Sequence, residues 1–268
     1  MTSTIFTNAS FTERDVMLSS GQLHIREGGN GRPLLHLHSA GGPRISPMLG
    51  RLAARHRLIC PFAPGMEDTP ALPTVKTVPA LADLYAELIR KEIGDEPCDV
   101  MGESFGGYVG LWLAAKHPGL VDHLVLEGPG GLRVDGKGGW QKGDPETRQR
   151  LLYAQPDRAP KETRSAEVLA ANRKTIDGYN NGNVFDSALA ARLPEIKART
   201  LIVMGYKEQV IPVETGHLLK AKIPQSHLTY IFGAAHAIAF DQPERLGQLV
   251  ADFLERGESF IVRDPQAA

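Results

Sequence analysis

The amino-acid sequence predicts an α/β fold, in which helices flank a mostly parallel central sheet and a small helical cap is inserted after the sixth strand. Short apolar runs alternate with helix-like segments along most of the 268 residues. This alternation is typical of a parallel sheet that is covered by helices on both faces. One long stretch, residues 132–197, interrupts the pattern. The chain is long enough to bury the core of one such domain.

The apolar runs have the length and composition of buried strands. They lie at Pro33–His38, Arg57–Cys60, Cys98–Met101, His123–Glu127, Thr200–Met204 and His227–Phe232.

Helices are expected between these runs. Apolar residues repeat at helical spacing from about Val78 to Ile93, and Gly94 is a natural C-cap for that helix. The segment Tyr108–Lys116 is also helix-like. A last helix is expected to begin at Asp241, whose carboxylate would accept backbone N–H bonds, with Glu244 completing a capping box. The buried stripe of this helix comprises Leu246, Leu249, Val250, Phe253 and Leu254.

The stretch 132–197 is predicted to form the helical cap, and residues 1–131 and 198–268 the α/β core. It contains more charge and more loop signals than its surroundings, including Gly136–Gly139 and Asn180–Asn183. It is nevertheless too apolar for a disordered linker. The apolar residues that indicate a packed segment are Trp140, Leu152, Tyr153, Ile176, Tyr179 and Phe185.

The charge balance and hydropathy argue against several classes of partner. Thirty basic and thirty-one acidic residues leave a formal net charge of −1, so no nucleic acid and no anionic membrane is expected to bind. No apolar run approaches the roughly 20 residues of a membrane span, and Met1–Thr12 lacks the pattern of an export signal. We therefore expect a cytoplasmic protein with a small-molecule substrate. A homodimer is compatible with these numbers.

The two cysteines, Cys60 and Cys98, are too few for a disulfide framework or a cysteine-rich metal site. Both are expected to be small buried apolar residues. Neither a metal nor a cofactor is expected.

The most informative motif is Gly102-Glu103-Ser104-Phe105-Gly106. It lies between an apolar run and a helix-like segment, so Ser104 falls at a strand-to-helix corner. A sharp corner of this kind exposes the hydroxyl, and the glycines two residues away on each side let neighbouring chain approach without a Cβ clash. The pattern predicts that Ser104 is a nucleophile.

A serine nucleophile needs a base within hydrogen-bond reach, and histidine accepts and returns a proton near neutral pH. His236 is the best candidate, because it follows the last expected strand and precedes the last helix. His38 also ends a strand, but it fits better in a loop that shapes an oxyanion site. His36 would share a face of that strand and is interpreted as structural. Surface positions are expected for His117, His217 and His227.

The histidine in turn needs a carboxylate that fixes its tautomer and stabilises the imidazolium. Glu208 follows the run Thr200–Met204, in a loop that would direct it to the carboxyl edge of the sheet. Glu127 also ends a strand and is the second candidate.

From about Gly21 to Leu254 the chain resembles the α/β-hydrolase fold superfamily. The order Ser104, Glu208, His236 matches the nucleophile, acid, histidine order of that family. The other similar segments are His38-Ser39-Ala40-Gly41-Gly42, placed like the oxyanion loop, Pro64-Gly65, and Leu193-Pro194-Glu195-Ile196. The chain departs from many relatives at Ser39, where glycine is common, at Glu208, where aspartate is common, and at Met66-Glu67-Asp68, which replaces a glycine-rich continuation.

The resemblance implies a mechanism in which His236 takes the Ser104 proton as the hydroxyl attacks a carbonyl carbon. The backbone N–H groups of Phe105 and Ala40 would bind the oxyanion. Glu103 is interpreted as a structural support, because a negative charge beside the nucleophile opposes oxyanion formation. Arg44 is either solvated or a contact for a substrate carboxylate, and solvation is favoured.

The expected function is that of a serine hydrolase acting on a small carboxylic ester or a related acyl compound through an acyl-enzyme. C–C bond hydrolysis, perhydrolysis or a lyase reaction on the same fold are alternatives, because fold alone does not select the chemistry. A ligand receptor on a hydrolase scaffold is a further alternative.

Overall fold

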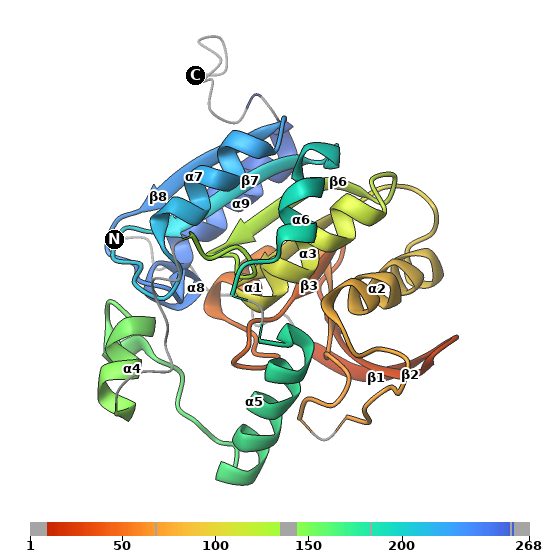
Figure 1. Cartoon of the computed structure of the whole chain (residues 1–268), viewed down its shortest axis with the longest axis horizontal. Helices are drawn as coiled ribbons and strands as arrows, with labels where there is room; N and C mark the ends of the chain where they lie inside the picture. The colour runs from red at the N-terminus through yellow and green to blue at the C-terminus, as the bar shows by residue number, and fades with distance from the viewer. Residues whose placement is uncertain (1–9, 68, 135–143, 183, 258, 260–268) are drawn as a thin grey trace.

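A computed structural model describes residues 10–67, 69–134, 144–182, 184–257 and 259. An eight-stranded sheet runs through the molecule in the order β1-β2-β4-β3-β5-β6-β7-β8 (Figure 1). Strands β1, β2 and β4 pair antiparallel, and every later pair is parallel. The strands are β1 (Phe11–Leu18), β2 (Gly21–Gly28), β3 (Arg32–Leu37), β4 (His56–Pro61), β5 (Cys98–Glu103), β6 (Val121–Glu127), β7 (Arg199–Gly205) and β8 (Ser226–Ile231).

Helices cover both faces of this sheet, which confirms the predicted α/β class (Figure 1). The α-helices are α1 (Pro47–Leu52), α2 (Val78–Glu92), α3 (Phe105–Lys116), α4 (Pro145–Leu152), α5 (Ala166–Asn180), α6 (Ser187–Arg192), α7 (Val213–Lys222), α8 (Ile238–Asp241) and α9 (Pro243–Arg256). Two short 3₁₀ helices, η2 (Pro156–Arg158) and η3 (Leu193–Glu195), complete the described helical segments.

Two hydrophobic cores fill the two faces. One packs α2, α3 and α7 against the sheet through residues such as Leu81, Leu113 and Leu219. The other packs α1, α8 and α9 through Met48, Phe253 and their neighbours. Because both faces are buried, the central strands are apolar nearly throughout.

All the apolar runs predicted as strands are strands, with ends that differ by one or two residues. The sequence interpretation missed the hairpin of β1 and β2. Strand β1 contains the polar run Thr12–Asp15, and its buried residues, Val16 and Leu18, lie near its end. A strand with one solvated face lacks the continuous apolar run that marks the central strands. Cys60 and Cys98 are free and buried, as expected.

The helix predicted from Val78 to Ile93 is confirmed as α2. Its C-terminal residue is Glu92, and the N–H groups of Ile93 and Gly94 both donate to the Ile89 carbonyl oxygen. Gly94 has φ +116°, a conformation that glycine adopts without a Cβ penalty.

The predicted capping box of the last helix is wrong. Helix α9 begins at Pro243, and its N-cap, Gln242, makes no side-chain cap. Asp241 instead closes the short helix α8, and its carboxylate accepts hydrogen bonds from backbone elsewhere in the fold. Glu244 forms an ion pair with Arg51 at 2.8 Å. The expected buried stripe is present apart from Leu249, which is half-buried.

The chain between β6 and β7 carries α4, η2, α5, α6 and η3. Figure 1 shows α4 and α5 beside one edge of the sheet, whereas α6 lies alongside α3. Ile176 and Tyr179 of α5 are buried, whereas Phe185 is 41% exposed. Trp140 and the loop signal at Gly136–Gly139 lie outside the described residues. No described helix is both long and apolar enough to cross a membrane.

Candidate active site

Ser104 occupies a strained corner between β5 and α3. Its backbone has φ 52° and ψ −108°, and φ values in this range are uncommon for residues other than glycine. A Cβ on Gly102 would lie 2.3 Å from the Gly106 carbonyl oxygen, and one on Gly106 would lie 2.0 Å from the Leu37 carbonyl oxygen. Both positions therefore require glycine, as the motif predicts.

Loops that follow different strands bring Ser104, His236 and Glu208 together. His236 lies after β8, and its Nε2 is 2.9 Å from the Ser104 Oγ. Glu208 lies after β7, and its Oε2 is 2.7 Å from the His236 Nδ1. With the proton held on Nδ1 by the carboxylate, Nε2 is free to accept the serine proton. The structure thus brings together the three residues that the sequence analysis selected.

Glu208 is also anchored by the backbone. Its second carboxylate oxygen, Oε1, accepts the N–H groups of Val210 at 2.7 Å and Ile211 at 3.1 Å. The two oxygens thus perform separate tasks, and the longer glutamate side chain reaches the histidine from a loop that it helps to hold. Burial raises the pKa of Glu208, but the charge of His236 and these hydrogen bonds outweigh it, so the pKa lies below its usual value.

The pKa of His236 moves in the opposite direction. Burial lowers it, but the adjacent Glu208 carboxylate and its hydrogen bond outweigh burial and raise the pKa above the usual value of histidine. Glu103 raises it further, and Arg133 opposes that effect.

The loop His38–Gly42 lies beside this corner, because the Cβ position of Gly106 approaches the His38 carbonyl oxygen as well as that of Leu37. His38 is buried, its Nδ1 donates to the Ser39 carbonyl oxygen at 2.8 Å, and its Nε2 accepts the Ala63 N–H at 3.0 Å. Both ring nitrogens are therefore used to hold the loop. Burial lowers the pKa of His38, and lowers that of His36 to about 3. Neither histidine is placed as the base.

Within the described chain, the N–H groups of Ala40 and Phe105 form no hydrogen bond to backbone acceptors. Phe105 is the first residue of α3, where N–H groups are not used within the helix. Both groups thus remain available to an oxyanion, and their assignment to that role stays a prediction.

Two further carboxylates lie below the site. Glu103 and Glu127 are register partners at the ends of β5 and β6. Glu127 is buried, and its Oε1 accepts the Ala239 N–H at 2.8 Å, so it holds helix α8 while Glu208 contacts His236. Burial and the neighbouring Glu103 raise the pKa of Glu127 well above its usual value. Burial also raises the pKa of Glu103, against His236 and a hydrogen bond with Ser39. The Ser39 contact supports the structural interpretation of Glu103.

Arg44 forms an ion pair with Glu162. Its guanidinium group is therefore neither surrounded by solvent alone nor unpaired beside the site. Arg164 shares Glu162 at 2.8 Å, pairs with Glu67 at 2.8 Å, and donates to the Gly41 carbonyl oxygen at 2.7 Å. Asn172 of α5 exchanges two hydrogen bonds with Glu67.

Sequence reasoning missed this network, although it had singled out Met66-Glu67-Asp68 as unusual. Asp68 lies outside the described residues.

Two of the histidines expected at the surface pair with other side chains. His117 binds Asp83 at 2.8 Å, and His217 binds the Tyr230 hydroxyl at 3.0 Å. One described cluster has ligand atoms close enough for a metal: Asp99, Asp122 and His123, near the amino ends of β5 and β6. Arg32 already pairs with both aspartates, at 2.7 and 2.6 Å. This cluster lies at the edge opposite Ser104 and forms an ion network.

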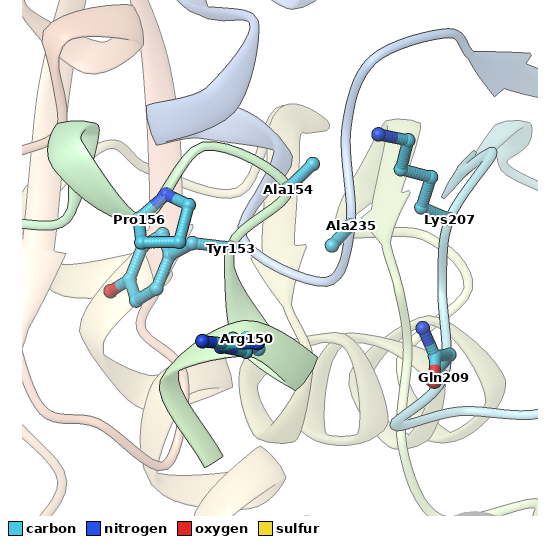
Figure 2. A pocket seen from close by; sticks show the side chains of 7 residues that line it. All are labelled: Arg150, Tyr153, Ala154, Pro156, Lys207, Gln209 and Ala235. Carbon is cyan, nitrogen blue, oxygen red and sulfur yellow. The ribbon is translucent and has the colours of Figure 1, made fainter. Parts of the chain in front are cut away.

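A cavity of about 410 Å³ lies where α4 meets the loops after β7 and β8 (Figure 2). Ala154 and Ala235, which is next to His236, both line it and lie close to each other. Its other lining residues are Arg150, Tyr153, Pro156, Lys207 and Gln209.

Comparison with known proteins agrees with the fold. A curated 2-hydroxy-6-oxo-6-phenylhexa-2,4-dienoate hydrolase from Burkholderia cepacia is 24% identical over 286 residues, which cover 90% of this chain and 93% of that protein. A pimeloyl acyl-carrier-protein methyl ester esterase from Neisseria meningitidis is 26% identical over 249 residues, which cover 84% of this chain and 92% of that protein.

Among solved structures, a serine hydrolase involved in carbazole degradation, the CarC enzyme, is similar in fold, with a TM-score of 0.75 and 22% identity. The match covers 92% of this chain and 99% of that one. The model of the alpha/beta hydrolase family matches residues 34–249, most of the chain. The protein therefore belongs to the alpha/beta hydrolase family.

Proposed function

We propose that the protein is a serine hydrolase that cleaves a small carboxylic ester or a related acyl compound. The observation that supports this most strongly is the hydrogen-bonded series from Ser104 Oγ through His236 to Glu208, with distances of 2.9 and 2.7 Å. The strained backbone of Ser104 supports it too, because strain at a serine corner has a use when the hydroxyl must be exposed.

In the proposed reaction, His236 Nε2 takes the Ser104 proton as Oγ attacks the ester carbonyl carbon. The N–H groups of Ala40 and Phe105 stabilise the resulting oxyanion, each by about 3 kcal/mol. His236 then gives the proton to the departing alcohol, and the acyl group remains on Ser104. A water molecule, deprotonated by His236, releases the acid and restores the hydroxyl.

The charges around the site favour a neutral acyl substrate. Arg44 and Arg164 are the arginines beside the loop His38–Gly42, and both are already neutralised by Glu162 and Glu67. Glu103, beside the nucleophile, adds a carboxyl group that would repel an anion if ionised. A substrate carboxylate would therefore have to displace an existing ion pair to gain Arg44 or Arg164 as a partner.

Hydrolysis of a C–C bond next to a ketone is the second candidate. It is supported by the relatives, since the hydrolase from Burkholderia cepacia is named for a 2-hydroxy-6-oxo-dienoate substrate. The same serine, histidine and acid could serve that reaction, with the proton delivered to carbon in place of oxygen. The esterase from Neisseria meningitidis supports the first candidate in the same way.

An ester hydrolysis assay that compares the unmodified protein with Ser104→Ala tests the proposal. The unmodified protein should release p-nitrophenol from p-nitrophenyl acetate or butyrate, and Ser104→Ala should lose this turnover by about 10⁴-fold or more while it keeps its circular dichroism spectrum. Ser187→Ala, at an exposed serine of α6, is the matched control and should retain full activity.

Two outcomes would count against the proposal. Retained turnover in Ser104→Ala would remove the nucleophile assignment. Efficient release of benzoate from 2-hydroxy-6-oxo-6-phenylhexa-2,4-dienoate, with ester turnover far below the roughly 1 to 1,000 per second typical of enzymes, would select C–C hydrolysis.

A further inference from the structure

Asp241 connects the loop that carries His236 to a distant part of the chain. Its side chain is completely buried. Its Oδ2 accepts the N–H of Ala235, the residue before His236, at 2.9 Å. The same oxygen accepts the N–H of Ala154 at 2.9 Å, and Oδ1 accepts that of Gln155 at 3.0 Å. One carboxylate therefore binds both the His236 loop and the chain that follows α4.

A separate hydrogen bond makes the same connection on the other side of the histidine. Ala237, the residue after His236, donates its N–H to the carbonyl oxygen of Leu152 at 2.8 Å. Both chain neighbours of His236 are thus tied to residues 152–155, directly or through Asp241. We call residues 152–155 the docking segment. The Asp241 carbonyl oxygen also accepts from Arg158 at 2.8 Å, which extends the contact into η2.

The burial of Asp241 makes this connection consequential. A buried carboxylate is tolerated when hydrogen-bond donors surround it, and it becomes unfavourable when they leave. If the docking segment moved away, Asp241 would lose the N–H groups of Ala154 and Gln155, and Ala237 would lose its acceptor. The backbone on both sides of His236 would then be held less firmly.

There is space for such a movement beside the contact between the docking segment and the His236 loop. The cavity of about 410 Å³ borders this contact, and both Ala154 and Ala235 line it (Figure 2). The docking segment contacts the core through these hydrogen bonds, through Leu152 on the cluster of Met204, Val210 and Ile211, and through Tyr153 on Phe240. Its side chains are only partly buried, and segments of this kind open at lower free energy than the central strands.

We propose that Asp241 is a positioning residue that aligns His236 with Ser104 only while the docking segment is bound to it. The inference rests on the proposed function, since it concerns the geometry of the same site. It makes the hydrolytic activity depend on the state of the chain between β6 and β7. When that chain docks, the histidine is aligned; when it leaves, the site is misaligned and hydrolysis slows.

The size of the effect follows from the distances at the histidine. Proton transfer needs both His236 contacts, which are 2.9 Å to Ser104 and 2.7 Å to Glu208. A displacement of about 1 Å at a reacting group can lower the rate by about 10²-fold. Substrate affinity does not depend on these two contacts in the same way, so kcat should fall more than KM rises.

Asp241→Asn tests the proposal, because it keeps the size of the side chain and places an amide group where an oxygen accepts a backbone N–H. We expect kcat for p-nitrophenyl acetate to fall by about 30-fold or more, with KM changed by less than about threefold. Glu244→Gln is the matched control, since Glu244 is an exposed carboxylate three residues later that pairs with Arg51. It should retain full activity.

The pH profile separates positioning from a general loss of structure. Glu208, Glu103 and Arg133 are the charged groups that act on His236, and a looser contact with Glu208 should move the acid limb of kcat/KM to lower pH. If Asp241→Asn lost activity only in proportion to its unfolded fraction, and kept the wild-type profile, Asp241 would be a structural residue and the proposal would be overturned. Unchanged kcat in the folded variant would overturn it as well.

A second variant keeps the test valid if Asp241→Asn does not fold. Ala154→Pro removes one donor to Asp241 without altering the carboxylate, and Tyr153 already has the extended backbone that a following proline prefers. We expect kcat to fall by about tenfold with the same displacement of the pH profile, and unchanged kcat with an unchanged profile would contradict the proposal.

Labelling of the unmodified protein and of both variants with a fluorophosphonate distinguishes a failure of the proposed function from a failure of the role of Asp241. If Ser104 is not labelled, the proposed function has failed. If Ser104 is labelled and both variants react at the unmodified rate, only the role of Asp241 has failed.

Discussion

Single residues at the ends of strands define the candidate site. The sequence placed Ser104, Glu208 and His236 at strand ends, and the structure brings these side chains within hydrogen-bond distance. Position alone could not separate Glu208 from Glu127, because the carboxyl ends of parallel strands meet at one edge of the sheet. The direction of each side chain separates them, since Glu127 points to the Ala239 amide.

Glu208→Gln should change the pH dependence of the reaction as well as its rate. Burial lowers the pKa of His236 and Glu208 raises it, so removing the Glu208 charge leaves burial dominant. The base must be neutral, and the acid limb of kcat/KM should therefore move to lower pH. The maximal kcat should fall by about 10³- to 10⁴-fold.

Stopped assays of kcat/KM between about pH 4 and 9 would measure this effect. Glu214→Gln, at an exposed glutamate in the first turn of α7, is the control and should keep both the rate and the profile. An acid limb of Glu208→Gln at the same pH as in the unmodified protein, or at higher pH, would contradict the pairing of Glu208 with His236.

At the scale of elements, the corner between β5 and α3 depends on close contact between backbones. Gly106 is the second residue of α3, and alanine normally stabilises a helix more than glycine does. Its Cβ would nevertheless lie 2.0 Å from the Leu37 carbonyl oxygen, so strand β3 and the corner could not both keep their positions.

Gly106→Ala should therefore lower the free energy of unfolding by about 3 kcal/mol and greatly reduce activity. Gly119→Ala provides the control, because no atom lies within 4 Å of the Cβ position of this exposed glycine. Urea unfolding curves measure both. Equal stability of the two variants would show that the close approach of Gly106 to Leu37 is not a structural requirement.

Local patterns predicted the central elements well and the peripheral ones poorly. The strands buried on both faces are continuous apolar runs, which stand out in the sequence, whereas β1 and β2 have a solvated side and lack such runs. The pattern of Asp241 and Glu244 matches a capping box in sequence. The structure gives Asp241 a different role because Ala154 and Gln155, more than 80 residues away in the chain, supply its donors. No local pattern contains that information.

In the molecule as a whole, the chain between β6 and β7 is attached to the core beside two loops, His38–Gly42 and the loop that carries His236. Arg164 and Asn172 attach it near His38–Gly42, and Asp241 attaches it near His236. The sequence predicted an inserted segment with buried apolar residues. The sequence could not predict these hydrogen bonds and ion pairs, because each joins residues that are far apart in the chain.

Limited proteolysis tests whether the described part of this chain is packed as a cap. Trypsin should cut the folded protein slowly at the basic residues of α5 and α6, because Ile176, Tyr179 and Leu189 are buried against the core. The same sites should be cut rapidly in urea, which serves as the control. Rapid cleavage throughout 132–197 in the folded protein would rule out a packed cap.

Covalent labelling with a fluorophosphonate, followed by peptide mass spectrometry, tests whether Ser104 is an activated nucleophile. The reagent reacts with a serine only when a neighbouring base activates it, so it reports the arrangement of Ser104, His236 and Glu208 together. We expect one modified residue, Ser104, and loss of labelling in His236→Ala. A label on another serine, or no label at Ser104 in the folded protein, would contradict the assignment of Ser104.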